Sequence, residues 1–583
     1  MTQALSNPCL IPFLIGVTGH RDLRPQDIAA LEAAVQSVID GFRTRLPSTP
    51  VILLSGLAAG ADQLVARVAL RCKVDLAAVL PMPDDLFKAT MDAEGQKHFD
   101  ELLPQASLVI RLPLAPGVTE SQLAQSEDAR AEQYESLAVF LSTYSQVVIA
   151  LWDGGTSDAK GGTYSVIRYV LGNPPESADS WSEPQSGVIY RIATSRVSNP
   201  HATGKAFDLE VLISLEPNGA AEEKGEDGKE YRALELSLET FNRDAMGKEF
   251  GDANALDGLV AQCKASPASF ACRVGKCYWA ADDLSIRFSD QTKSTLLWIL
   301  GFALTAVAGF EIYAHVFSSH FALWLVYPGA LVGAWMVHRF TKHRRIETRY
   351  LDYRALAEAL RVQFFWSLAG IHESVAEHYL VHHRTPLDWI RYALRGIWLF
   401  QLLETSDAGG SEKEMRLALE HWIQDQKGYY ARTSRKQKAA LHRLERWSGG
   451  SLRGVWFLSL LIPISLLIPW EGLAEWRALA SEEPWLGLLI LLTTLPSITI
   501  GLIRVWMEQG GYEEQVRNYN RMAHVFGRAE KRIEADLASN DPKTAETRIK
   551  NARDGIYRLG IQALEENGDW LLLHRERPLK VVG

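Results

Sequence analysis

Two glycine-containing stretches decide the fold of the N-terminal part of the chain: residues 13–21, FLIGVTGHR, and residues 51–62, VILLSGLAAGAD. In each stretch a short apolar run leads directly into glycines, and the second stretch then enters a helical pattern. Continuous apolar runs of this length indicate strands that are buried on both faces, as in a parallel sheet covered by helices. We therefore predict that the glycines follow the carboxyl ends of parallel strands, the edge at which such sheets bind ligands.

The sequence up to about residue 205 continues this alternation of strands and helices. The expected strands are Phe13–Thr18, Val51–Ser55, Leu76–Leu80, Ser107–Arg111, Val147–Trp152 and Val188–Ala193. The expected helices between them include Gln26–Leu46, Ala61–Arg71, Glu127–Ser142 and Thr163–Leu171. This order predicts an α/β, Rossmann-like, doubly wound parallel sheet domain over residues 1–205.

A third glycine region lies at the same predicted edge of the sheet. Residues 152–155, WDGG, end the fifth expected strand, and residues 160–163, KGGT, open the next helix. Glycine lets the backbone approach a ligand that a side chain would block, and the first amide groups of a helix favour an anion. We expect such amides at the helix starting with Ala61 to point at a phosphate. The alternative interpretation is that short connections simply require tight turns.

The candidate ligand-binding residues come from these three regions: Gly16, Thr18, Gly19, His20, Arg21, Ser55, Gly56, Gly60, Ala61, Asp62, Asp153, Gly161, Gly162 and Thr163. Arg21 could clamp a phosphate with paired donors, or it could be a solvated loop residue. His20 either contacts the ligand or fills the turn. Asp62 could bind a ribose hydroxyl or complement the dipole of its helix. Asp153, beyond a strand end, is expected to contact a polar ligand group.

Four long apolar segments follow in the second half of the chain: Ser294–Phe317, Phe321–Phe340, Gly454–Trp470 and Trp485–Trp506. Each is close to the roughly 20 residues that a helix needs to cross a bilayer. Trp and Tyr stand near the segment ends, as they do at membrane interfaces. The alternative is that these are core helices of a large soluble protein. We predict two hairpins in an all-α membrane domain with four transmembrane helices and long cytoplasmic helices.

Charge placement predicts the orientation of these hairpins. Basic residues flank them on the side away from their connecting loops: Arg287, Lys293, Arg339, Lys342, Arg344, Arg345, Arg443, Arg446, Arg453 and Arg504. The loop 318–320 has no basic residue other than His320, and the loop 471–484 contains a single one, Arg477. By the positive-inside rule, both hairpins enter from the cytoplasm and return to it, so the N-terminal domain is expected to be cytoplasmic.

These predictions divide the chain into five consecutive segments. The α/β domain at 1–205 is followed by a linker and helical connector at 206–290 and by a first hairpin with a cytoplasmic helix at 291–380. A helical cytoplasmic segment occupies 381–450, and a second hairpin with a cytoplasmic helix occupies 451–583. The acidic, glycine-containing stretch 216–231 is expected to be an exposed loop.

Composition excludes several classes of protein. The formal net charge of −9 argues against a protein that coats nucleic acid, because phosphate binding requires an excess of Lys and Arg. The 5 cysteines are too few and too scattered for a disulfide framework and fit a reducing compartment. Cys272 and Cys277 have no second pair of ligands in the sequence, so no metal is expected. The first residues lack the pattern of a secretory signal.

The glycine motifs resemble those of the SLOG superfamily, a Rossmann-like group of nucleotide-sensing domains that includes phosphoribohydrolases. Three groups of residues carry the resemblance: residues 16–21, residues 55–62, and Asp153 with the run 161–163. The C-terminal part is similar to SLATT-type proteins, in which transmembrane hairpins followed by a cytoplasmic helix are proposed to act as pore-like effectors. The two hairpins and Leu351–Trp366 carry that similarity.

The resemblance implies a membrane effector or channel-like protein of the bacterial inner membrane. Its cytoplasmic domain would sense a nucleotide-derived small molecule, such as ADP-ribose or another nucleotide signal, and alter the transmembrane region in antiphage defence. The lipid bilayer is an expected partner, and nucleic acid is not. Because four spans leave little room for water, a pore requires several chains, and a homo-oligomer is expected.

Catalysis is the main alternative to sensing. Phosphoribohydrolases of the superfamily carry a catalytic Glu that would lie near Ser165 or Val166, and this sequence has no carboxylate there. Without that group an enzyme lacks its means to activate water, so we predict binding with no catalytic residue and no resident cofactor. A membrane-tethered nucleotide hydrolase and a scaffold with an empty crevice are the competing hypotheses.

Overall fold

The chain packs as two compact units. The computed structural model describes residues 7, 9–157, 159–172, 187–201, 203–215, 221–223, 227–247, 269–379, 387–403, 410–467, 483–509, 512–538 and 545–575. Unit 1 consists of Met1–Asp282 and Leu356–Gly409, and unit 2 of Asp283–Ala355 and Gly410–Gly583. Thus a segment that follows the first expected hairpin in sequence belongs to the same unit as the N-terminal α/β domain.

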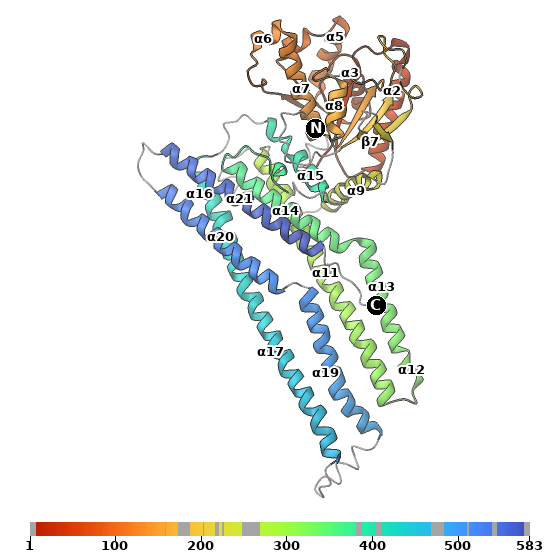
Figure 1. Ribbon diagram of the computed structural model, residues 1–583, viewed down its shortest axis with the longest axis vertical. Coiled ribbons are helices and arrows are strands. Elements are labelled where there is room, and N and C mark those ends of the chain that lie inside the picture. Colours follow the sequence, from red (N-terminus) through yellow and green to blue (C-terminus); the bar gives the residue numbers. More distant parts are fainter. Residues whose placement is uncertain are drawn as a thin grey trace. The chain divides into compact units, whose positions relative to one another are not determined.

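Unit 1 is built on one twisted sheet (Figure 1). Its strands within the described residues are β1 (Phe13–Gly19), β2 (Val51–Ser55), β3 (Asp75–Leu80), β4 (Leu108–Arg111), β5 (Val147–Trp152), β6 (Val188–Ala193), β7 (Leu209–Leu215) and β8 (Ala221–Glu223). The order across the sheet is β4-β3-β2-β1-β5-β6-β7-β8, and strands β1 to β6 pair in parallel. The predicted parallel sheet is therefore confirmed.

The position of β1 between β2 and β5 creates a switch point in this topology. The chain adds strands outward from β1 to β4 and then returns to the other side of β1 with β5. At such a point the connections leave β1 and β5 in opposite directions, which opens a crevice beyond their carboxyl ends. Val17 and Ile149 lie in this central pair and are fully buried.

Helices pack on the sheet to complete unit 1. They are α2 (Ile28–Arg45), α3 (Ala61–Arg71), α4 (Asp84–Lys88), α5 (Ala93–Leu102), α6 (Glu120–Gln125), α7 (Glu127–Tyr144), α8 (Thr163–Val170), α9 (Asp227–Ala245) and α15 (Asp388–Trp398). The four helices expected between the strands are confirmed. Helix α7 begins where it does because the Ser126 side chain accepts a hydrogen bond from the Ala129 amide, which satisfies one of the unpaired donors at the helix start.

One edge of the sheet departs from the predicted pattern. Residues 209–215 were expected in a linker, but they form β7, which pairs antiparallel with β6. The expected loop 216–231 contains β8 and the start of α9, while residues 216–220 and 224–226 lie outside the described residues. An antiparallel edge strand on a parallel sheet is common in doubly wound folds.

The edge of unit 1 opposite the crevice is held by a network around Gln146. Its side chain accepts a hydrogen bond from the Leu14 amide and donates one to the Tyr392 carbonyl at 3.2 Å, and its own carbonyl accepts one from the Tyr231 hydroxyl. Nearby, Arg395 of α15 donates to the Thr143 carbonyl of α7 at 3.1 Å and to both carboxylate oxygens of Glu377, each at 3.1 Å. Residues after the first hairpin thus complete the base of the sheet.

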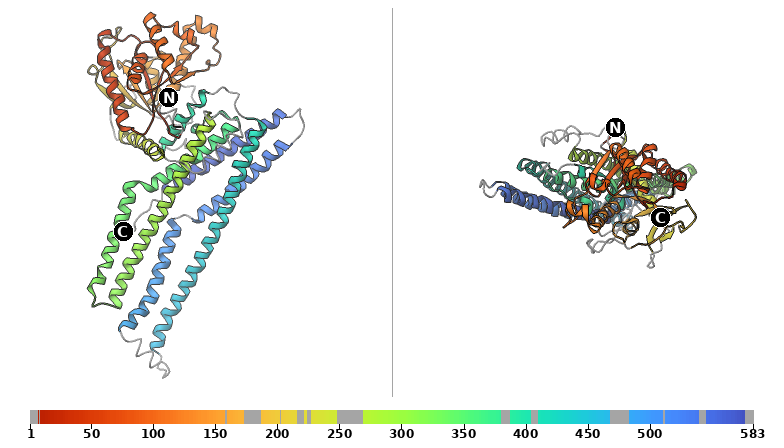
Figure 2. Two further views of the ribbon diagram at one scale, coloured as in Figure 1. Left: turned by 180° about the vertical axis from the view of Figure 1, so that it is seen from behind. Right: turned by 90° about the horizontal axis from the view of Figure 1, so that it is seen from above.

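Unit 2 is helical. Its described helices are α12 (Phe321–Trp324), α13 (Val326–Arg344), α16 (Glu412–Ala418), α17 (Asp425–Leu467), α19 (Glu483–Gln509), α20 (Tyr512–Ala538) and α21 (Ala545–Arg575), with parts of α11 (Phe270–His315) and α14 (Ile346–Leu368). Figures 1 and 2 show α11 beside α13 and α17 beside α19. Close approach of the first pair is visible at Gly333, where an added Cβ would lie 2.7 Å from the Phe302 ring.

Three helical stretches in the described residues are long and apolar enough to cross a membrane. They are Phe270–His315, Phe321–Leu368 and Gly487–Met507. The fourth expected segment, Gly454–Trp470, is described as helix only to Leu467, and its remainder lies outside the described residues. Large apolar side chains stand on the outer faces of these helices: Trp298 is 65% exposed, Trp335 61% and Trp456 65%. In a single chain these faces are suited to contact lipid or other chains.

Candidate functional site

A cavity of about 610 Å³ lies in unit 1 beyond the carboxyl ends of β1 and β5. This volume is within the range of small-molecule sites, and the switch point is where such folds bind ligands. Of the residues predicted to bind ligand, nine line the cavity: Thr18, Gly19, His20, Arg21, Asp62, Asp153, Gly161, Gly162 and Thr163. The other five do not: Gly16, Ser55, Gly56, Gly60 and Ala61.

His20 and Asp153 form the junction between the loops that follow β1 and β5. The His20 Nε2 atom lies 3.0 Å from Asp153 Oδ1, and Arg196 Nη1 lies 3.0 Å from His20 Nδ1. Because a guanidinium can only donate, Nδ1 must accept, while Nε2 faces both the Asp153 carboxylate and the Asp153 backbone amide, whose nitrogen lies 3.2 Å away. Burial lowers the pKa of His20, and Arg196 lowers it further against the opposing effect of Asp153. His20 is therefore held from several sides, in surroundings that favour its neutral form.

Asp153 is an anchor for the loop that it begins. Its Oδ1 accepts the Gly155 amide at 2.9 Å, and its Oδ2 accepts the Asn199 side-chain amide at 2.9 Å. Burial opposes its charged form, but these hydrogen bonds and the neighbouring His20 outweigh burial and lower its pKa. Asp153 lines the cavity as expected, yet much of its acceptor capacity is used within the protein.

Two amides of the second glycine region are engaged within the protein. The Ala61 amide donates to the His20 carbonyl at 3.1 Å, and the Leu57 amide donates to the Ser55 hydroxyl at 3.1 Å. Gly60 has φ of +88°, and a Cβ there would lie 2.4 Å from the Arg21 carbonyl oxygen. These contacts hold the second loop against the first. The first amide of the Ala61 helix is therefore occupied, and phosphate binding at this helix start stays a prediction.

The third glycine region supplies the helix start that faces the cavity. Gly162 is the N-cap of α8, and Gly162, Thr163 and Tyr164 all line the cavity. Among the described residues, the amides of Thr163 and Tyr164 have no acceptor. Unpaired amides at a helix start, together with the positive end of the helix dipole, form an anion-binding site.

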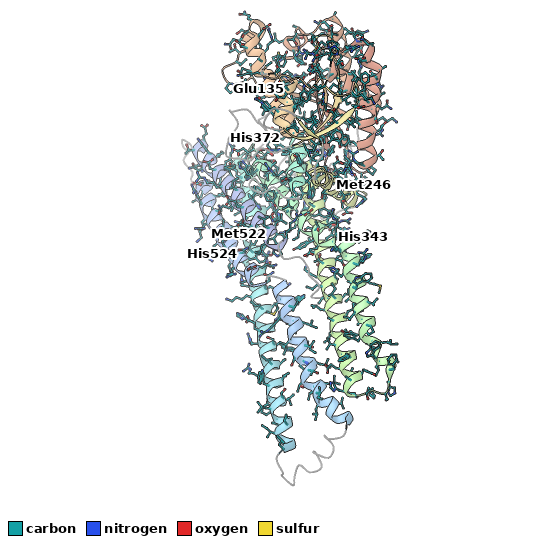
Figure 3. All side chains as sticks on the ribbon, turned by 45° about the vertical axis from the view of Figure 1, so that its right-hand side comes forward. Glu135, Met246, His343, His372, Met522 and His524 are labelled. Atoms are coloured by element: carbon teal, nitrogen blue, oxygen red, sulfur yellow. The ribbon has the colours of Figure 1, made fainter. Side chains whose placement is uncertain are left out.

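Gly161 explains how this turn is held. Its φ is +66°, which favours glycine, and a Cβ would lie 2.4 Å from the backbone of Tyr134. The Gly161 amide donates to Glu135 Oε2 at 2.7 Å, and the Tyr169 hydroxyl donates to the other oxygen of Glu135. Glu135, labelled in Figure 3, thus fixes the turn before α8 from the neighbouring helix α7.

Arg21 is a cationic side chain of the cavity that remains available to bind an anionic ligand. Its guanidinium lies 5.2 Å from the centre of the Tyr134 ring, and within the described residues it makes no ion pair. By contrast, Lys160 pairs with Glu132, and Arg196 lies 3.4 Å from Asp22. Arg21 and the start of α8 therefore supply the positive character that an anionic ligand group would meet.

Asp62 is the buried carboxyl of the cavity. Only 8% of it is exposed, and its Oδ2 accepts the Ala58 amide at a long distance of 3.4 Å. Burial raises the pKa of Asp62 to about 7, against the lowering effects of the Ala58 amide and Arg21. A carboxyl with such a pKa inside a cleft is typical of functional positions.

Several lining residues were not found from the sequence. Tyr134, Trp152, Tyr164, Arg196 and Asn199 line the cavity, and Trp152 and Tyr164 stack with ring centroids 6.1 Å apart. Trp152 precedes Asp153 and Tyr164 follows Thr163, so their positions next to the predicted motifs could have identified them as lining residues. Tyr134, Arg196 and Asn199 come from segments without a motif and reach the cavity only through the fold.

The described residues contain no cluster of three or more His, Cys, Asp or Glu side chains suited to hold a metal ion. Ser165 and Val166, near which the resemblance to phosphoribohydrolases would place a Glu, are buried, and Ser165 donates to the Ala159 carbonyl at 3.1 Å. In comparisons with known proteins, no family model and no curated protein matches this chain.

Proposed function

We propose that unit 1 is a receptor for a nucleotide-derived anionic ligand and that binding alters the membrane-spanning helices of the same chain. The observation that carries this proposal is that one cavity brings together the unpaired amides at the start of α8 and the available guanidinium of Arg21. This combination suits phosphate oxygens. Trp152 and Tyr164 add aromatic surface to the cavity wall, on which a base can stack.

The effector role rests on the motifs in the sequence and on the apolar helices. We propose that the chain spans the bacterial inner membrane four times, with Gly454–Trp470 as the third span, and that unit 1 is cytoplasmic. The similarity to SLOG domains supports a nucleotide signal such as ADP-ribose. The similarity to SLATT-type hairpins supports a channel-like, homo-oligomeric effector in antiphage defence. A ligand drives a near-complete switch only if it prefers one state by about 5.5 kcal/mol.

Helix α11 offers a direct covalent route for such coupling. It is a single helix of 46 residues whose residues up to Asp282 belong to unit 1 and whose residues from Asp283 belong to unit 2. The first apolar stretch, Phe270–His315, is this same helix. A change in its packing within unit 1 is thus transmitted along a continuous hydrogen-bonded backbone.

Binding without cleavage is favoured by the arrangement around α8. Glu135 is a carboxylate that contacts α8 and the turn before it, the region where a phosphoribohydrolase would have its catalytic Glu. Both of its oxygens accept hydrogen bonds, from the Gly161 amide and the Tyr169 hydroxyl. A carboxylate so engaged is a poor base for activating water. Release of free base or phosphate from a nucleotide panel by purified protein would instead support the hydrolase.

The binding step is tested by thermal unfolding of the full-length protein in detergent with a panel of nucleotides that includes ADP-ribose and cyclic ADP-ribose. A ligand that prefers the folded protein raises the apparent melting temperature. Arg21→Ala should weaken binding roughly 10- to 150-fold, because a hydrogen bond to a charged group contributes about 1.5–3 kcal/mol. Arg43→Ala is the matched control, since Arg43 lies on α2 outside the cavity.

The effector step is tested by ion flux from liposomes that contain the protein. We expect the nucleotide that binds in the first assay to change the flux, and Arg21→Ala to require a higher concentration for the same change. Vesicles that remain ion-tight while the nucleotide demonstrably binds would contradict the effector role and leave the receptor role intact.

A further inference from the structure

The carboxyl of Asp62 faces the same cavity as the proposed anion site at α8 but offers a different kind of contact to a ligand. Asp62 is the second residue of α3, and its side chain lines the cavity although the residue is only 8% exposed. Within the described residues its carboxyl has a single hydrogen bond, the long one from the Ala58 amide, and no ion pair within 4.0 Å. A buried polar group with so few partners is costly unless a ligand or a proton satisfies it.

The surroundings of Asp62 favour its neutral form. Burial is the largest influence and raises its pKa to about 7, while the Ala58 amide and Arg21 only partly oppose this. Arg21 is itself exposed and lies over Tyr134 rather than pairing with Asp62. When an anionic ligand group occupies the cavity, it repels a carboxylate and attracts Arg21. Both effects shift Asp62 further toward the neutral acid.

Other ionisable side chains line the cavity beside Asp62. Those that line it are His20, Arg21, Asp22, Tyr134, Asp153, Lys160, Tyr164 and Arg196. The pKa values of Asp22 and Asp153 are lowered and that of Lys160 is raised, so these groups stay charged. The pKa of His20 is lowered from its ordinary 6.5, which favours the neutral ring. Asp62 differs from the other lining carboxyls, Asp22 and Asp153, because its pKa is raised.

We propose that Asp62 binds the ligand as a neutral carboxylic acid that donates its hydrogen to an acceptor atom of the ligand. Capture of the anionic ligand at Arg21 and α8 is then accompanied by proton uptake at Asp62, in proportion to the fraction of Asp62 that is ionised in the free protein. The contact rests on the proposed function, because it requires a ligand in the same cavity. The contact also defines the chemistry of the ligand. The ligand would carry an anionic group and, elsewhere, an uncharged hydrogen-bond acceptor next to a hydrogen-bond donor.

The edge of an adenine ring has this pattern, since a ring nitrogen accepts and the exocyclic amine donates. A carboxylic acid offers the complementary O–H donor and C=O acceptor, and the side-chain amide of asparagine offers an N–H donor and a C=O acceptor in the same arrangement. An ionised carboxylate offers only acceptors. Asparagine at position 62 therefore imitates the neutral acid at every pH, which provides a substitution that separates the two forms.

The test is calorimetric titration of the full-length protein in detergent with ADP-ribose, and cyclic ADP-ribose, whose adenine N1 is closed onto ribose, is titrated alongside for binding alone. The bridging phosphates of ADP-ribose keep a constant charge between pH 6 and pH 8, so any proton exchanged when it binds comes from the protein. For wild type we expect an affinity about tenfold higher at pH 6 than at pH 8, as follows for an acid with a pKa near 7 that binds only when protonated. Repeating the titration in buffers with different ionisation enthalpies should show net proton uptake.

Asp62→Asn should bind at pH 8 about as tightly as wild type does at pH 6 and should show a flat pH profile. Asp100→Asn is the matched control, because Asp100 lies on α5 outside the cavity and is exposed, and it should keep the wild-type profile. Binding without proton uptake, or a loss of affinity in Asp62→Asn while its melting temperature is unchanged, would overturn this contact and leave the receptor standing. Failure of both nucleotides to bind at any pH would overturn the receptor and the contact together.

Discussion

Replacing Gly60 with alanine tests the clamp between the first two loops of the cavity. Gly60 has φ of +88°, and an added Cβ would lie 2.4 Å from the Arg21 carbonyl oxygen and 2.6 Å from both the Arg21 Cα and the His20 carbonyl oxygen. All three neighbours are backbone atoms, which cannot rotate aside. The substitution therefore forces the two loops apart and should break the hydrogen bond from the Ala61 amide to His20.

The loss of stability expected for Gly60→Ala has two contributions, and a matched control variant separates them. A non-glycine residue in such a conformation costs roughly 1–3 kcal/mol, and overpacking against backbone adds roughly 1–3 kcal/mol. Gly117 has a similar φ of +83°, but a Cβ there meets nothing within 4 Å. Gly117→Ala should therefore incur only the first cost, and Gly60→Ala should incur both.

The assay is thermal unfolding of the two full-length variants, followed by binding of ADP-ribose. For a domain of this size, a difference of about 1–3 kcal/mol corresponds to roughly 2–10 °C. Gly60→Ala should melt lower than Gly117→Ala by this amount and should bind the nucleotide more weakly, because Arg21 and His20 move. Equal melting temperatures for the two variants would refute the reasoning that the loops are held in contact at Gly60.

Two further substitutions probe stability in unit 1. Because the pKa of folded Asp62 is about 7, above its ordinary 3.8, wild type loses stability as the pH rises from about 4 to about 7. Asp62→Asn escapes this loss, so its free energy of unfolding should gain on that of wild type across that window by at most about 4 kcal/mol and then level off, which thermal unfolding at each pH measures. A constant difference from pH 4 to pH 8 would contradict the raised pKa. Arg395→Ala removes the donor to the Thr143 carbonyl and to Glu377, whose side chain is 48% exposed, and should destabilise unit 1 by roughly 1–3 kcal/mol. Unfolding in denaturant measures this loss, and a change below about 1 kcal/mol, the level of an exposed ion pair, would contradict it.

The sequence was sufficient for the parts of the fold that local pattern determines. The runs at Phe13 and Val147 are apolar throughout because the central strands are buried on both faces, and this makes them recognisable without the structure. Strand β7, with the sequence LEVLISL, was missed because it pairs antiparallel near the edge of the sheet, outside the alternation of strands and helices in the rest of the domain. The membership of Leu356–Gly409 in unit 1 depends on contacts with residues far away in sequence, such as Gln146 with Tyr392.

The candidate site was predictable in position but not in detail. Strand ends locate the crevice, so Arg21, Asp153 and Thr163 were identified from their places after strands or before a helix. Which helix start remains free to bind an anion was not predictable, because the Ala61 amide is satisfied by the carbonyl of His20, a residue from a different loop. The pKa of Asp62 likewise follows from burial, which its place in a helical first turn does not reveal.

The division of unit 1 into two sequence segments has a consequence for how the protein is made. A ribosome releases the sheet first, then the hairpin-forming residues 283–355, and only then α15 with Tyr392 and Arg395. Nascent unit 1 therefore lacks the acceptor for Gln146 and the donor for Thr143 until residues 283–355 have already been translated. Completion of unit 1 is thereby ordered after translation of two apolar helices, and a fragment ending at residue 282 would correspond to an intermediate of biosynthesis rather than to a finished domain.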